Sequence, residues 1–147
     1  MHSTRPETCF IDGQTFDGAT LVGEISGGCS ATAITTLSVR NTILWPGGVQ
    51  VSHGNILIGD VYGLAIYTYA PPVSGSLGAP TTITTLPGAI SPVSFVLEED
   101  AKHVRTADNS PDSEFAARYT YPGGSYMSKL ANHISPIAVA VYPPAQP

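Results

Sequence analysis

Charged residues are scarce in this sequence: they make up 12% of the chain, against about 25% in an average soluble domain. Its few bases stand singly at Arg5, Arg40, Lys102, Arg105, Arg118 and Lys129. Nucleic-acid binding needs clustered Lys and Arg to displace counterions, so this scatter excludes nucleic acid as an expected partner. Low charge also leaves little repulsion between copies of the chain, which favours self-association.

Long apolar runs are also missing. No run of about 18 apolar residues occurs, so we expect no membrane-spanning segment. The first eight residues, MHSTRPET, are polar and lack the apolar stretch of a signal peptide. From this start we expect either that the protein stays inside the cell or that a leader has been removed or lies outside this sequence.

Cysteine is rare, and helical patterning is almost absent. Cys9 and Cys29 are too few to form a metal site on their own. A disulfide between them would suit an oxidising compartment, and two buried free thiols are the alternative that the sequence leaves open. Only residues 113–118 resemble a helix, and they align with a strand.

What the sequence does contain is an internal repeat. Residues 48–51 (GVQV), 92–95 (PVSF) and 136–139 (PIAV) begin 44 positions apart each time. Shorter matches keep the same order, with ITTL at 34–37 and 83–86, and YTY at 67–69 and 119–121. Fixed self-similarity of this kind indicates a repeat architecture.

Each repeat consists of short Thr-, Val-, Ile- and Tyr-rich runs bounded by Gly, Pro, Asn and Ser, which predicts about four strands per unit. A four-stranded unit of about 44 residues fits a β-propeller blade. We therefore expect one all-β domain over 1–147, with about three propeller-type blades. The expected units are 8–47, 48–91 and 92–135, followed by a terminal strand over 136–142. The first unit is thin, because the stretch from Glu24 to Leu37 has room for one strand where the others have two.

Acidic residues recur once per unit, at Glu24, Asp60 and Asp108. At one rim of a propeller, three carboxylates could hold a hard cation such as Ca²⁺ through oxygen ligands. The alternative is that each acid accepts backbone N–H bonds in the adjoining turn. The repetition favours this structural interpretation, because an enzyme rarely needs the same residue in every blade.

Other candidate side chains have weaker patterns. The run 98–100 (EED) in a hairpin loop is typical of a solvated tip, and His103 beside it shows no metal-ligand spacing. The aromatic residues could form a carbohydrate-stacking surface: Trp45, Tyr62, Tyr67, Tyr69, Tyr119, Tyr121 and Tyr126. In a Tyr-Thr-Tyr strand, however, both tyrosines point to one face, which favours packing between blades.

Two segments carry a family resemblance. Residues 45–51 (WPGGVQV) followed by 56–60 (ILIGD), and 119–124 (YTYPGG) followed by 134–139 (ISPIAV), resemble blades of bacterial NHL-like or SMP-30-like β-propellers. The SMP-30-like enzymes hold a metal with acids and amides for lactone hydrolysis. The resemblance therefore implies an alternative function, a metal-dependent lactonase with Glu24, Asp60 and Asp108 as Ca²⁺ ligands.

Three blades are few for a closed ring, and an open arc exposes strand edges that invite pairing with another chain. The expected terminal strand could join a neighbouring subunit by β-augmentation, through Ile137, Val139, Val141 and Tyr142. We therefore expect a homo-oligomer, closed as a ring of two chains or open as a filament. The sequence favours a non-enzymatic structural or interaction protein outside the cell, without a cofactor, over the lactonase alternative. A third interpretation is that the chain is a fragment of a longer propeller and has no separate function.

Overall fold

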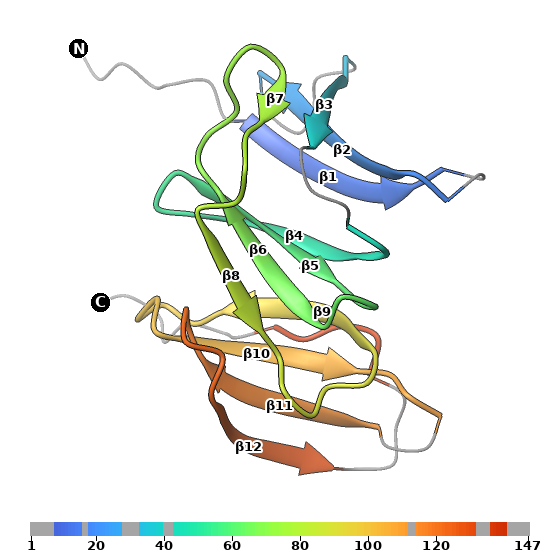
Figure 1. Ribbon diagram of the computed structural model, residues 1–147, viewed down its shortest axis with the longest axis vertical. Coiled ribbons are helices and arrows are strands. Elements are labelled where there is room, and N and C mark those ends of the chain that lie inside the picture. Colours follow the sequence, from blue (N-terminus) through green and yellow to red (C-terminus); the bar gives the residue numbers. More distant parts are fainter. Residues whose placement is uncertain are drawn as a thin grey trace.

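The computed structural model describes residues 8–15, 18–27, 33–39, 43–111, 114–131 and 136–140. These residues form three four-stranded sheets and no helix, and so contain no helix that could cross a membrane (Figure 1). We name the sheets blades 1 to 3. Blade 1 holds β1 (Thr8–Gln14), β2 (Thr20–Ser26), β3 (Thr35–Val39) and β7 (Ser76–Leu77); blade 2 holds β4 (Pro46–Ser52), β5 (Asn55–Asp60), β6 (Ala65–Tyr69) and β8 (Thr82–Thr85); blade 3 holds β9 (Pro92–Leu97), β10 (His103–Asp108), β11 (Phe115–Thr120) and β12 (Tyr126–Ala131).

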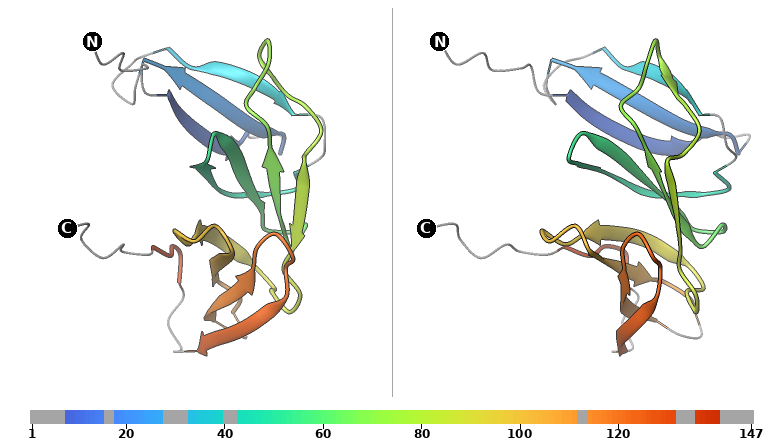
Figure 2. Two further views of the ribbon diagram at one scale, coloured as in Figure 1. Left: turned by 90° about the vertical axis from the view of Figure 1, so that its left-hand side faces the viewer. Right: turned by 60° about the vertical axis from the view of Figure 1, so that its left-hand side comes forward.

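The blades stack face to face along the long axis of the molecule (Figures 1 and 2). Side chains alternate between the two faces of a strand, and β11 shows this pattern clearly. Phe115, Ala117 and Tyr119 are buried against blade 2, whereas the residues between them face the other side. Blade 3 thus buries one face and leaves its outer face to solvent.

Blade 2 is covered on both faces, and the residues of its strand β5 are correspondingly apolar on both sides. Every residue of β5 after Asn55 is buried. Ile56 and Ile58 join the core shared with blade 1, while Leu57 joins the core shared with blade 3. A continuous apolar run is what a strand buried on both sides requires. Blade 2 therefore forms the centre of the stack.

The fourth strand of blade 1 comes from a distant part of the chain. β7 lies in the loop between β6 and β8 of blade 2 and pairs in parallel with β3 (Figure 1). Its Leu77 is fully buried in the core between blades 1 and 2. This strand explains how a first unit with so few residues still builds a four-stranded sheet.

The inner strands approach one another closely. β4 lies beside β1 on one side and β9 on the other. A Cβ atom at Gly47 would lie 2.9 Å from the carbonyl oxygen of Pro92, which is too close for any side chain. Gly47 is therefore required by the packing of blade 2 on blade 3.

The predicted fold class is confirmed: the described chain is all-β, with three four-stranded sheets arranged as propeller-type blades. The tyrosines of the two Tyr-Thr-Tyr strands pack in the blade cores, as predicted. β7 was not predicted, because two residues between Gly75 and Gly78 give no strand signal. Residues 136–140 form no strand in the structure, and Val141 and Tyr142 lie outside the described residues. Pairing of this segment with another chain stays a prediction.

Candidate functional site

Asp60, at the end of β5, is almost completely buried. Its carboxylate accepts hydrogen bonds from the backbone N–H groups of Leu44 (3.0 Å), Trp45 (3.1 Å) and Gly63 (3.0 Å). Val61 N–H in turn donates to the Trp45 carbonyl at 2.8 Å. The side chain thereby ties the segment that enters β4 to the turn that leaves β5. We call this arrangement the aspartate clamp.

Blade 3 repeats the aspartate clamp at Asp108, at the end of β10. This buried carboxylate accepts from the N–H groups of Ile90 (2.6 Å) and Ser91 (3.0 Å), just before β9. Asn109 N–H donates to the Ser91 carbonyl at 2.9 Å. In both blades the register of the two inner strands shifts close to the clamp. The two aspartates therefore hold equivalent positions.

Glu24 does not share this position. It lies inside β2, opposite Phe10, rather than opposite the first residue of the inner strand as Asp60 and Asp108 do. Its carboxylate accepts a bond from the Ser26 hydroxyl at 3.0 Å. The spacing that aligned Glu24 with the two aspartates ignored the register shifts in blades 2 and 3.

The three predicted metal ligands do not fit one shared calcium ion. Among the described residues, the acids and histidines close enough to share an ion are Glu98, Asp100 and His103, and none of the predicted ligands is among them. The oxygens of Asp60 and Asp108 are also occupied by backbone N–H groups. The geometry favours the structural interpretation of these two aspartates.

A cluster of ionisable groups lies on the outer face of blade 3. Glu98 follows β9. Its carboxylate oxygens accept hydrogen bonds from Arg105 Nε at 2.7 Å and from Arg118 Nη2 at 2.6 Å. The two arginines are direct partners across β10 and β11, where like charges repel. Glu98 neutralises that repulsion, and its hydrogen bond with Arg118, aided by the charge of Arg105, holds the pKa of Glu98 below its usual range.

His103 extends this cluster toward the hairpin tip. Its Nδ1 lies 2.6 Å from an Asp100 carboxylate oxygen and 3.7 Å from Glu98. The Lys102 backbone N–H lowers the pKa of Asp100, and the hydrogen bond with His103 lowers it further. Because an ionised carboxylate only accepts hydrogen bonds, Nδ1 carries the proton in this contact. The sequence showed Arg105 and Arg118 as isolated bases, since only the strand register reveals that they meet.

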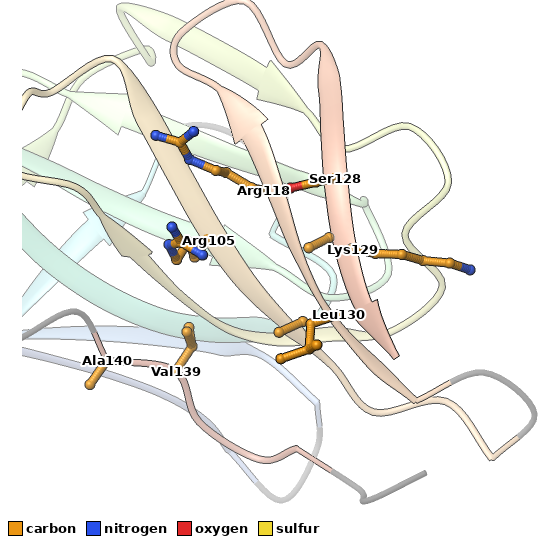
Figure 3. A pocket seen from close by; sticks show the side chains of 9 residues that line it. Arg105, Arg118, Ser128, Lys129, Leu130, Val139 and Ala140 are labelled. Carbon is orange, nitrogen blue, oxygen red and sulfur yellow. The ribbon is translucent and has the colours of Figure 1, made fainter. Parts of the chain in front are cut away.

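A cavity of about 410 Å³ adjoins the cluster. Its lining includes Arg105, Arg118, Leu130 and two residues of the C-terminal segment, Val139 and Ala140. Figure 3 shows Arg105 between Arg118 and these two residues, with the amine of Lys129 pointing away. The predicted assembly residue Val139 thus lies on the outer face of blade 3, whereas Ile137 is exposed.

The cysteines are only partly described. Cys9 is disulfide-bonded, and Cys29 lies outside the described residues. The predicted Cys9–Cys29 pairing therefore stays a prediction. The disulfide on Cys9 nevertheless points to an oxidising environment.

A search of solved structures finds a likeness to a protein from Bacteroides uniformis described as a candidate 6-phosphogluconolactonase. The match has a TM-score of 0.50 and 16% sequence identity, and it covers 90% of this chain. The chain spans 41% of the length of that protein. No protein-family profile matches the sequence, and no curated protein does. At this identity the likeness supports a propeller-like fold, and it does not identify the NHL-like or SMP-30-like families.

Proposed function

We propose that the protein is a non-enzymatic structural or interaction subunit that acts outside the cell by assembling with further copies of itself. The observation that supports the proposal is that, among the described residues, no other blade covers the two outer faces of the three-blade stack. Blade 1 exposes an apolar face at one end, and blade 3 exposes a mixed face at the other. Stacking of copies end to end would cover both.

The outer face of blade 1 is apolar. In β2, Val22 packs toward blade 2, so the neighbouring Gly23 faces outward. A Cβ atom at Gly23 would meet Ile11 at 2.9 Å and Ile34 at 2.7 Å, which places both isoleucines over this face. Ile11 is 41% exposed and Ile34 is 54% exposed. Contiguous exposed apolar side chains mark contact surfaces in soluble proteins.

The outer face of blade 3 differs in character. It carries the Glu98, Arg105 and Arg118 cluster and the exposed Leu130. Because the two outer faces are unlike, the proposed contact joins blade 1 of one copy to blade 3 of the next. Such a head-to-tail contact closes a ring of two copies or continues as a filament. The disulfide on Cys9 supports the proposed extracellular location.

Charge placed on the blade 1 face tests the proposal. Ile11→Lys and Ile34→Lys should each shift the sedimentation of the protein toward a single chain, because the contact would bury an added positive charge against the face that carries Arg105 and Arg118. Val73→Lys is the matched control, since Val73 is also exposed and lies in the β6–β8 loop. Circular dichroism confirms that each variant is folded. Unchanged sedimentation of both isoleucine variants would contradict the proposal.

A second candidate function, hydrolysis of a sugar lactone with a bound cation such as Ca²⁺, is supported by the structural likeness. Hydrolysis of glucono-δ-lactone followed in a pH-stat, with added Ca²⁺ or a chelator, tests this candidate. Measured calcium content of the purified protein gives a second readout. Turnover that requires Ca²⁺ would favour the lactonase over the assembly proposal. Hydrolysis at the buffer rate, with no bound metal, would reject it.

A further inference from the structure

Two aromatic side chains lie side by side on the surface at one end of blade 2. Trp45, just before β4, is 45% exposed, and Tyr62, in the turn after β5, is 64% exposed. Their ring centroids are 5.6 Å apart and their planes are inclined by 56°. Leu44 beside them is also exposed. Contiguous exposed apolar groups of this size mark binding surfaces.

The backbone that carries both rings is fixed. The aspartate clamp of Asp60 holds the N–H of Trp45 on one side and the N–H of Gly63, next to Tyr62, on the other. The rings are therefore attached to a rigid support, which limits the conformational entropy that binding would cost.

Blade 3 shows that the clamp itself does not need aromatic rings. Around Asp108, the position of Trp45 is taken by Ser91, and the position of Tyr62 is taken by Ser110. The bonds on the entering side, from Ser91 N–H to Asp108 and from Asn109 N–H to the Ser91 carbonyl, form there with these small polar residues, whereas Pro111 takes the position of Gly63 and has no N–H to donate. The ring pair is therefore an addition to blade 2 rather than a requirement of the blade fold.

A cavity of about 490 Å³ lies against Trp45. It is lined by Gln14, Thr15, Leu21 and Trp45, and none of these side chains is charged. Gln14 is held in place because its Nε2 donates to the Gly18 carbonyl at 2.9 Å and to the Leu44 carbonyl at 3.3 Å, so its amide oxygen is the group left to face a ligand. The Thr15 hydroxyl exchanges hydrogen bonds with the backbone of Ala19. The described part of the lining thus combines apolar surface with an amide and a hydroxyl, which suits a neutral ligand that carries hydroxyls.

We propose that Trp45 and Tyr62 form a binding site for a neutral pyranose oligosaccharide. A pyranose ring has a face of C–H bonds, which packs on an aromatic ring, and an edge of hydroxyls, which pair with polar groups. Two inclined rings match successive sugar units better than one flat monosaccharide. Beside Trp45, the amide oxygen of Gln14 supplies an acceptor for a sugar hydroxyl. This site is independent of the proposed assembly.

The single tryptophan makes the test direct, because Trp45 is the only one in the chain. Titration with maltohexaose, cellohexaose and chitohexaose should change the Trp45 emission with at least one of them, and calorimetry should give the same affinity. Tyr62→Ser, which introduces the residue found in blade 3, should keep the tryptophan signal and weaken binding by about tenfold, the equivalent of about 1.4 kcal/mol.

Tyr126→Ser is the matched control, since Tyr126 is a partly exposed tyrosine on blade 3, and it should bind as the parent does. No emission change and no heat with all three saccharides at millimolar concentration would overturn the proposal. So would equal binding by the parent and Tyr62→Ser. Loss of self-association in Tyr62→Ser without saccharide binding by the parent would instead assign the rings to a protein contact.

Discussion

Asp60 and Asp108 give two neighbouring blades the same connection. Each carboxylate gathers the backbone N–H groups of the segment that enters its blade and so fixes where the inner strand begins. Hydrogen bonds to an ionised group are stronger than those between neutral groups, and a buried N–H left without a partner is costly. An acid that recurs once per blade is thus explained by backbone geometry.

Asp60→Ala should lower the free energy of unfolding by about 3 kcal/mol, because three backbone N–H groups lose their acceptor. Urea denaturation measures this loss. Glu24→Ala should cost much less, since Glu24 is half-buried and, in the part of the chain that the structure describes, its carboxylate accepts a side-chain hydrogen bond from the Ser26 hydroxyl alone.

Calcium content measured on the same two variants separates the clamp from the metal hypothesis. If the carboxylates were ligands of one ion, Asp60→Ala and Glu24→Ala would lower bound calcium equally. An equal loss of bound calcium in both variants, with no difference in their stability, would contradict the structural role of Asp60.

Glu98 should make stability depend on pH. Its pKa in the folded protein lies below that of the unfolded chain, which is about 4.3. The stabilisation is therefore fully present above that value and is lost as the pH falls through the folded pKa. Glu98→Gln should be less stable than the parent at pH 7, and the difference should shrink at about pH 3 in urea denaturation.

Glu99→Gln is the neighbouring control, because Glu99 is exposed, and it should change stability little at either pH. A Glu98→Gln effect of the same size at both pH values would show that the side chain acts through packing and not through its charge.

At the scale of elements, β7 links blade 1 to the loop of blade 2. The pairing is short, with Ser38 opposite Ser76 and Val39 opposite Leu77. Its anchorage comes from the fully buried Leu77 side chain. A short parallel strand between two glycines has no periodic signal, so the sequence alone could not reveal which sheet it joins.

Leu77→Ala should destabilise blade 1 by about 2 to 5 kcal/mol, because it leaves a cavity in the core between blades 1 and 2. The backbone amides of β1 to β3 should then exchange hydrogen faster than in the parent, while the amides of β10 and β11 stay protected. Leu130→Ala, at an exposed leucine, serves as the control. Equal quickening in all three blades would contradict a local role for β7.

At the scale of the whole molecule, the repeat spacing was sufficient to predict the blades. β5 and β9 to β12 lie within the predicted units 48–91 and 92–135, whereas the predicted boundary between the first two units falls inside β4. The spacing could not place the acids correctly. Glu24 matched Asp108 by residue count, but the register shifts that bring Asp60 and Asp108 to the blade edge depend on backbone contacts between strands.

The exposed rings of Trp45 and Tyr62 are a second feature that the sequence alone could not predict. The sequence suggested a carbohydrate surface made of Trp45 and six tyrosines. In the structure some of these side chains are buried and others are exposed. Tyr69 and Tyr119 are fully buried in the blade cores, whereas Trp45 and Tyr62 meet at the surface. Which aromatic side chains are available to a ligand depends on the stacking of the blades.

In the proposed assembly, further copies of the chain complete the three-blade stack. Native mass by light scattering, with electron microscopy of the same sample, measures this assembly. We expect a species of two chains, each of 15.3 kDa, or filaments built from them. A stable, folded species of one chain at micromolar concentration would contradict it.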